Sequence, residues 1–148
     1  MSCLRPLTKI GIFIALALFF TFANAFAQET AEEAFNKGVD NFDQGSYEIA
    51  ISDFTRAIEI NPNLADAYNN RAAAYNYKSS YDQAIYDCNK AIELDPNSAQ
   101  AYNNRIFAYY SKQDYDKAWD DVHKIEELGA KVKPEYLEEL KKTSGREK

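Results

Sequence analysis

After residue 30 the sequence repeats with a period of 34 residues. Three copies align at this spacing without a gap, at residues 31–64, 65–98 and 99–132. The second and third copies share the run Ala-Tyr-Asn-Asn-Arg, from Ala67 and Ala101. The first two end in Ala-Ile-Glu-x-x-Pro-Asn, from Ala57 and Ala91. A constant period of this length indicates one supersecondary unit that is copied along the chain.

Each copy contains two segments of about 13 residues in which apolar or small side chains recur at intervals of three and four. This spacing predicts two amphipathic helices per copy. Pro62 and Pro96 close the first two copies, and proline is tolerated only near a helix start, so these residues end one unit and orient the next. Because one helix pair cannot bury both of its faces, the units must stack on their neighbours.

The copies resemble the tetratricopeptide repeat, a helix-turn-helix unit of the same length. Each copy has a tyrosine before the second helix, at Tyr47, Tyr81 and Tyr115, and an alanine three residues later. The resemblance implies an all-α fold, a right-handed superhelix (α-solenoid) of three such units. The sequence departs from the family pattern at three places, which are Ala34, Ile106 and the pair Gly129-Ala130.

A capping helix is predicted at residues 134–142. It follows Gly129, which is suited to a helix C-cap, and it begins with Pro134. Its apolar side chains, which can cover the last repeat, are Tyr136, Leu137 and Leu140. Residues 143–148 have no apolar anchor, so we expect a disordered tail. The repeat domain as a whole is predicted at residues 28–142.

The first 27 residues have the pattern of a secretory signal peptide. Arg5 and Lys9 precede an apolar run at residues 10–20, and the segment has no acidic side chain. Small residues near its end predict cleavage after Ala27, with cleavage after Ala25 as the second choice. An uncleaved membrane anchor stays open as an alternative, because the uncharged segment at residues 10–27 reaches the lower limit of about 17 residues needed to cross a bilayer.

Charge and composition argue against several classes of function. After the leader, the chain has 23 acidic residues against 15 basic ones, so nucleic acid is not expected as a partner. His123 and Cys88 have no second histidine or cysteine in the pattern that could complete a metal site or a triad. No phosphate-binding glycine loop, nucleophile elbow or zinc spacing occurs. We therefore expect a non-enzyme without cofactor or metal, in which Cys88 is buried and inert.

A basic residue at position 7 of each repeat and an aspartate at position 23 would lie level across an antiparallel helix pair. Repetition in step with the scaffold favours a structural role, as partly buried ion pairs. The three expected pairs are Lys37 with Asp53, Arg71 with Asp87 and Arg105 with Asp121.

Tetratricopeptide arrays present the inner faces of their first helices as a concave groove, and the resemblance implies such a groove here. Aromatic rings beside amides suit an extended peptide, because rings contact its side chains and amides hydrogen-bond its backbone. The candidate binding residues are Phe35, Val39, Phe42, Asn69, Asn70, Asn76, Tyr77, Asn103, Asn104, Phe107 and Tyr110. The alternative is that some of these aromatic residues pack between helices and bind nothing.

Family members that hold the acidic C-terminal tails of heat-shock chaperones carry lysines, asparagines and an arginine on these faces. The matching positions here hold Phe35, Val39, Gln100 and Asn104, and only Asn70 fits that pattern. With no lysine or arginine expected in the groove, a neutral, apolar or basic ligand is favoured over an acidic one.

These observations predict an exported adaptor or scaffold that binds a peptide segment or partner protein in the groove and has no membrane contact after cleavage. A bacterial source would make the protein periplasmic or secreted, and a eukaryotic source would place it in the secretory-pathway lumen or outside the cell. The alternative is a membrane-tethered or self-associating structural component of an envelope assembly. Three repeats are the minimum for this architecture, so stacking of a second copy, which would give a homo-oligomer, stays open.

Overall fold

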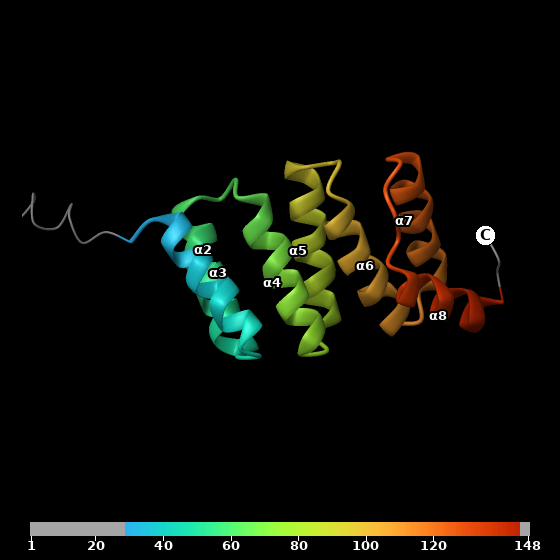
Figure 1. The fold of residues 1–148 in the computed structure, drawn as a ribbon, viewed down its shortest axis with the longest axis horizontal. Helices are drawn as coiled ribbons and strands as arrows, with labels where there is room; N and C mark the ends of the chain where they lie inside the picture. Colours follow the sequence, from blue (N-terminus) through green and yellow to red (C-terminus); the bar gives the residue numbers. More distant parts are fainter. Residues whose placement is uncertain (1–28, 146–148) are drawn as a thin grey trace, which may run out of the picture.

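The computed structural model describes residues 29–145, so the predicted leader lies outside the described range. Within this range all secondary structure is helical, which confirms the predicted fold class. Three helix pairs follow one another in a row and a last helix lies at its end (Figure 1). The helices are α2 Ala31–Asp43, α3 Tyr47–Ile60, α4 Ala65–Tyr77, α5 Tyr81–Leu94, α6 Ala99–Ser111, α7 Tyr115–Glu127 and α8 Pro134–Ser144. None of these helices is long and apolar enough to span a membrane.

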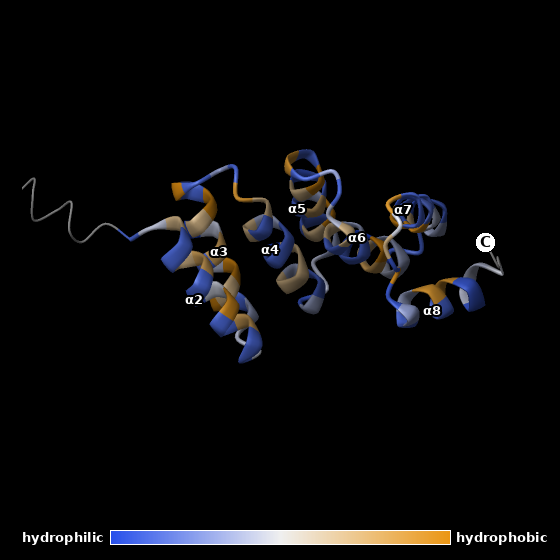
Figure 2. Ribbon diagram, turned by 45° about the horizontal axis from the view of Figure 1, so that its top comes forward, coloured by the Kyte–Doolittle hydropathy of each residue, from blue (hydrophilic) through white to orange (hydrophobic). Residues whose placement is uncertain are grey.

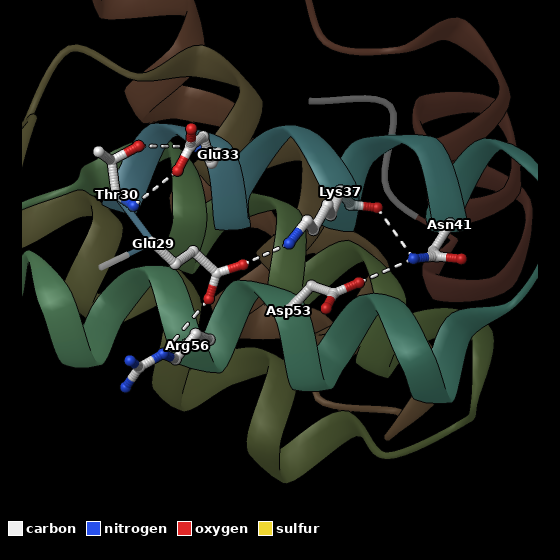
Figure 3. Close-up of polar contacts among 7 residues, drawn as sticks. All are labelled: Glu29, Thr30, Glu33, Lys37, Asn41, Asp53 and Arg56. Atoms are coloured by element: carbon white, nitrogen blue, oxygen red, sulfur yellow. Dashed lines mark hydrogen bonds and ion pairs between the residues drawn. The ribbon is translucent and has the colours of Figure 1, made fainter. Parts of the chain in front are cut away.

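Local signals set the helix ends. Before α2, Glu33 N donates to Thr30 Oγ1 at 3.1 Å and Thr30 N donates to Glu33 Oε2 at 2.9 Å, a capping box (Figure 3). The turn inside each repeat contains one residue with positive φ, at Gly45, Ser79 and Gln113. Only the first of these is a glycine, so the second and third turns hold the same backbone geometry with a side chain present.

The helices of the first pair approach closely because Gly38 has no side chain. A Cβ at Gly38 would lie 2.6 Å from two ring carbons of Phe54, which is fully buried. The third repeat has Ile106 at the position of Gly38, and Ile106 is buried in the same core cluster as Val122. The departure from the family pattern at Ile106 is therefore absorbed by the apolar core of the last repeat.

Two of the three expected ion pairs form. Arg71 Nε and Nη2 donate to the two carboxylate oxygens of Asp87 at 2.7 and 2.8 Å, and Arg105 makes the same two-bond contact with Asp121 at 2.8 and 2.5 Å. Arg71 Nη1 also donates to Thr55 Oγ1 in the preceding repeat at 2.8 Å. Arg105 Nη1 likewise donates to Asn89 Oδ1 in its preceding repeat, so each guanidinium ties its own helix pair together and reaches back to the previous pair.

The pair expected in the first repeat is wrong. Lys37 Nζ instead contacts Glu29 Oε1 at 2.6 Å, and Asp53 accepts a hydrogen bond from Asn41 Nδ2 at 2.7 Å (Figure 3). The physical reason is that a lysine ammonium lacks the rigid fork of a guanidinium, so it is not held on Asp53 and pairs with a partly exposed carboxylate instead. That carboxylate, Glu29, precedes the repeat and is therefore absent from the repeating pattern.

Helix α8 covers the end of the last pair. Leu140 is fully buried with Trp119, Val122 and Ile125, and an apolar band interrupts the polar residues of α8 in Figure 2. The helix ends at Ser144 rather than at residue 142, so the first two residues of the predicted tail are helical. Trp119 Nε1 donates to Ser144 Oγ at 3.1 Å, which holds this extra half-turn before the left-handed Gly145.

Candidate functional site

The first helices of the three repeats and the segment that leads into α8 enclose a pocket of about 370 Å³, which we call the groove pocket. Its side chains come from α2, α4, α6 and the start of α8, so it lies on the face predicted to be concave. The lining residues are Phe42, Asn69, Asn70, Ala73, Asn76, Tyr77, Gln100, Asn103, Asn104, Phe107, Lys133 and Tyr136.

Eight of the eleven candidate binding residues line this pocket, and Phe35, Val39 and Tyr110 do not. Phe35 packs on the buried Phe54, with ring centroids 5.7 Å apart, and therefore belongs to the core of the first repeat. Val39 is half-buried outside the groove pocket. Tyr110 lines a neighbouring cavity against α8. The alternative that an aromatic residue packs between helices, and is not part of the groove, therefore applies to Phe35.

At the end of the groove pocket between α2 and α4, the lining residues Phe42 and Tyr77 form a cluster with Tyr47 of α3, which does not line the pocket itself. Tyr47 and Tyr77 stack with centroids 4.6 Å apart and planes 9° apart. Phe42 meets both edge-on, at 5.4 and 5.5 Å. Tyr77 is nevertheless 64% exposed, so the cluster offers a large ring surface whose orientation is already fixed by its neighbours.

The middle of the groove pocket is a network of amides that hydrogen-bond to one another and to the backbone. Asn104 Nδ2 donates to Asn69 Oδ1 at 2.8 Å and to its backbone oxygen at 3.3 Å. Asn76 Nδ2 donates to the backbone oxygen of Asn104 at 2.8 Å, and Asn103 Nδ2 donates to that of Ala99 at 2.8 Å. The bonds of Asn76 and Asn104 connect α4 to α6, the bond of Asn103 lies within α6, and together they fix the orientation of the amides across the pocket.

One atom of this network has no partner. Asn76 is only 7% exposed, and its Oδ1 is buried and accepts no hydrogen bond from any residue in the described part of the chain. A buried acceptor without a donor costs about 1–3 kcal/mol. Oδ1 has almost no accessible surface, so a ligand donor in the groove pocket would reach it only after the Asn76 side chain turns, and the new bond would then recover part of this cost.

Lys133 and Tyr136 are pocket residues that the sequence did not predict. Lys133 N donates to Asn103 Oδ1 at 2.9 Å, and Lys133 Nζ lies 5.3 Å from the centroid of the Tyr136 ring. Burial raises the pKa of Tyr136, with smaller contributions from Glu135 and Tyr77. The expectation of a groove without lysine is therefore wrong. Both residues lie after the last 34-residue copy, so no repeat position could assign them to the groove.

The titratable side chains most often involved in catalysis lie elsewhere. Cys88 is fully buried between α4 and α5, and burial raises the pKa of its thiol far above the usual range. His123 is exposed on α7, with its ring 6.0 Å from that of Trp119. Among residues 29–145, no three histidine, cysteine, aspartate or glutamate side chains are placed to hold a metal ion. The groove pocket is equipped for binding through rings and amides.

Comparison with known proteins agrees with this architecture. Sequence profiles described as tetratricopeptide repeat and TPR repeat match residues 65–98 and 40–78. The first TPR domain of Spaghetti (RPAP3), bound to the HSP90 peptide SRMEEVD, is 31% identical with a TM-score of 0.73, over 78% of this chain and 91% of that chain. The TPR2B domain of yeast Sti1, in its complex with pHsp70, is 32% identical with a TM-score of 0.70, over 78% and 96%. The Arabidopsis OM64 TPR domain is 30% identical with a TM-score of 0.71, over 77% and 96%. This chain belongs to the tetratricopeptide repeat family.

Proposed function

We propose that this protein is an exported adaptor that binds an extended peptide segment of a partner protein in the groove pocket. The observation that carries the proposal is the arrangement of the pocket, in which exposed, pre-oriented rings flank a row of amides. Rings of this kind bind side chains at a low entropic cost, and amides can bond the backbone of an extended peptide.

The related domains support peptide binding. The Spaghetti domain holds the HSP90 peptide SRMEEVD, and the second TPR domain of human RPAP3 holds the HSP70 peptide SGPTIEEVD. Both peptides end in acidic residues. For the present chain we propose a neutral or basic peptide instead, because Nδ2 of Asn76, Asn103 and Asn104 each already donates within the protein. Lys133 is the one cation among the lining residues. Asn76 Oδ1 is an acceptor that a donor of the peptide would satisfy once the side chain turns toward the groove pocket.

Replacing Tyr77 by alanine is expected to weaken peptide binding about tenfold, because a rigid tyrosine in a binding surface commonly contributes more than 1 kcal/mol. The measurement is selection of peptides from a displayed random library on the purified protein, followed by titration of the selected peptides against both variants. Tyr86→Ala is the matched control, since Tyr86 is 60% exposed on α5 and does not line the groove pocket. Equal loss of binding in both variants would remove the groove assignment.

Export is the second part of the proposal and depends on residues 1–27. We expect the protein recovered after secretion to begin at Gln28, with a mass lower than that of the full chain by those 27 residues. Intact-mass spectrometry of protein from the producing cells measures this. A full-length mass in the membrane fraction would favour the membrane-tethered alternative, and sedimentation across a range of concentrations would reveal self-association.

A further inference from the structure

A second cavity, of about 220 Å³, lies beside the groove pocket where α8 crosses α6, and we call it the cap pocket. Its surface is almost wholly apolar and is formed by the rings of Phe107, Tyr110 and Tyr136 and by the carbon atoms of two glutamates, Glu135 and Glu139, which are themselves exposed beside it. We propose that the cap pocket binds the cationic end of a basic side chain, lysine or arginine, of the peptide that occupies the groove. This inference rests on the proposed function.

The rings supply one part of the attraction. The centroids of Phe107 and Tyr136 are 5.4 Å apart, and Phe107 and Tyr136 line both pockets. The two pockets are therefore adjacent, and a peptide in the groove pocket can place a side chain in the cap pocket. An organic cation is attracted to the faces of such rings, most strongly where the site is partly removed from water. In the described part of the chain, no cation lies over Phe107 or Tyr110.

The carboxylates supply the other part. Glu135 and Glu139 are one helical turn apart on α8, so their charges repel each other. Within residues 29–145 neither forms an ion pair, and Glu139 accepts only a long hydrogen bond, 3.5 Å, from Tyr110. A position in the first turn of α8 favours an acidic side chain at Glu135, but this does not account for Glu139. A cation between the two carboxylates would relieve their repulsion.

Lys133 is a cation that could oppose this binding, because it already lies over a ring of the cap pocket. It lines the groove pocket rather than the cap pocket, and its ammonium lies against Tyr136. Neither Glu135 nor Glu139 forms an ion pair with Lys133 or with the lysines of the last turn of α8, so both carboxylates beside the cap pocket can meet an added cation. The Lys133→Gln substitution should therefore strengthen cation binding, whereas Glu135→Gln with Glu139→Gln should weaken it.

The test is an NMR titration of the protein expressed from the full chain with choline and with neohexanol, the neutral alcohol in which a carbon replaces the quaternary nitrogen. We expect choline to shift the resonances of Phe107, Tyr136 and Glu139 and to bind about tenfold more tightly than neohexanol. The double glutamine variant should lose this difference, and Glu138→Gln should keep it, because Glu138 is an exposed carboxylate of α8 that does not line the pocket. Butylammonium and butylguanidinium then separate a lysine-like from an arginine-like preference.

Equal binding of choline and neohexanol, or equal choline binding by the double glutamine variant and the parent, would overturn the cap-pocket proposal. Neither probe is a peptide, so this result is independent of peptide capture by the groove. Loss of choline selectivity with intact peptide binding rejects the cation site alone. If the protein prefers choline to neohexanol but the library selection described for Tyr77→Ala yields no bound peptide, the adaptor function alone is rejected.

Discussion

Replacing Arg71 by methionine is expected to lower the free energy of unfolding by about 3–5 kcal/mol. The substitution removes both hydrogen bonds to the carboxylate of Asp87, which is only 1% exposed, and leaves that charge buried without a partner. It also removes the bond to Thr55 in the preceding repeat. Urea unfolding followed by circular dichroism measures the change, provided that the slope of the transition stays the same.

The loss of unfolding free energy in the Arg71→Met variant should depend on pH. Burial raises the pKa of Asp87, against the hydrogen bonds and charge of Arg71, which lower it. A carboxyl whose pKa is raised by folding contributes stability that is complete below its unfolded pKa, about 3.9, and is lost as the pH rises through the folded pKa. Without Arg71 the folded pKa rises further. The difference between the variant and the parent should therefore be largest at neutral pH and shrink as the pH falls into the acidic range.

Lys37→Met is the matched control, because Lys37 holds the same position in the first repeat. Its side chain is 61% exposed and contacts Glu29 at the surface, so we expect a change within about 0.5 kcal/mol. If Arg71→Met cost no more than Lys37→Met, Asp87 would have to be reached by water in the folded state. The proposed role of the guanidinium as the tie between repeats would then be wrong.

The contrast between Arg71 and Lys37 shows how far the repeat pattern reaches. Residues that recur at the 34-residue period sit in equivalent surroundings, so the spacing alone predicted the helix pairs and the pairing of Arg71 with Asp87. Lys37 has the right position but a different side chain, and its partner Glu29 lies before the first copy. A pattern cannot assign contacts to residues that occur outside it.

The part of the groove pocket next to α8 likewise contains residues that the repeat pattern could not predict. The repeat positions on α4 and α6 predicted Asn69, Asn103 and their neighbours, and the structure brings these together. Lys133 and Tyr136 enter from the segment after the third copy, whose path depends on how α8 packs on Trp119 and Leu140. That path is determined by tertiary packing, which the repeat pattern does not describe. Because the missed residues include the one cation among the lining residues, the sequence was least informative about the charge of the ligand.

Replacing Phe54 by alanine is expected to lower the free energy of unfolding by about 3–5 kcal/mol, because a fully buried ring is lost and a cavity remains. The same urea experiment measures this, and Tyr86→Ala, which removes an exposed ring, should change the value by less than about 0.5 kcal/mol. A small loss for Phe54→Ala would mean that α2 and α3 close over the vacated space.

Gly38 makes this prediction more specific. A methyl group at Gly38 would lie 2.6 Å from the Phe54 ring, so Gly38→Ala should destabilise the parent by about 1–3 kcal/mol from overpacking, less the roughly 1 kcal/mol that alanine gains over glycine in a helix. In the Phe54→Ala background the clash is gone and the methyl group partly fills the cavity, so the same substitution should stabilise. A double-mutant cycle measures this reversal of sign. Additive effects would show that the Phe54 ring moves aside freely, and then close approach at Gly38 would not be what fixes the first helix pair.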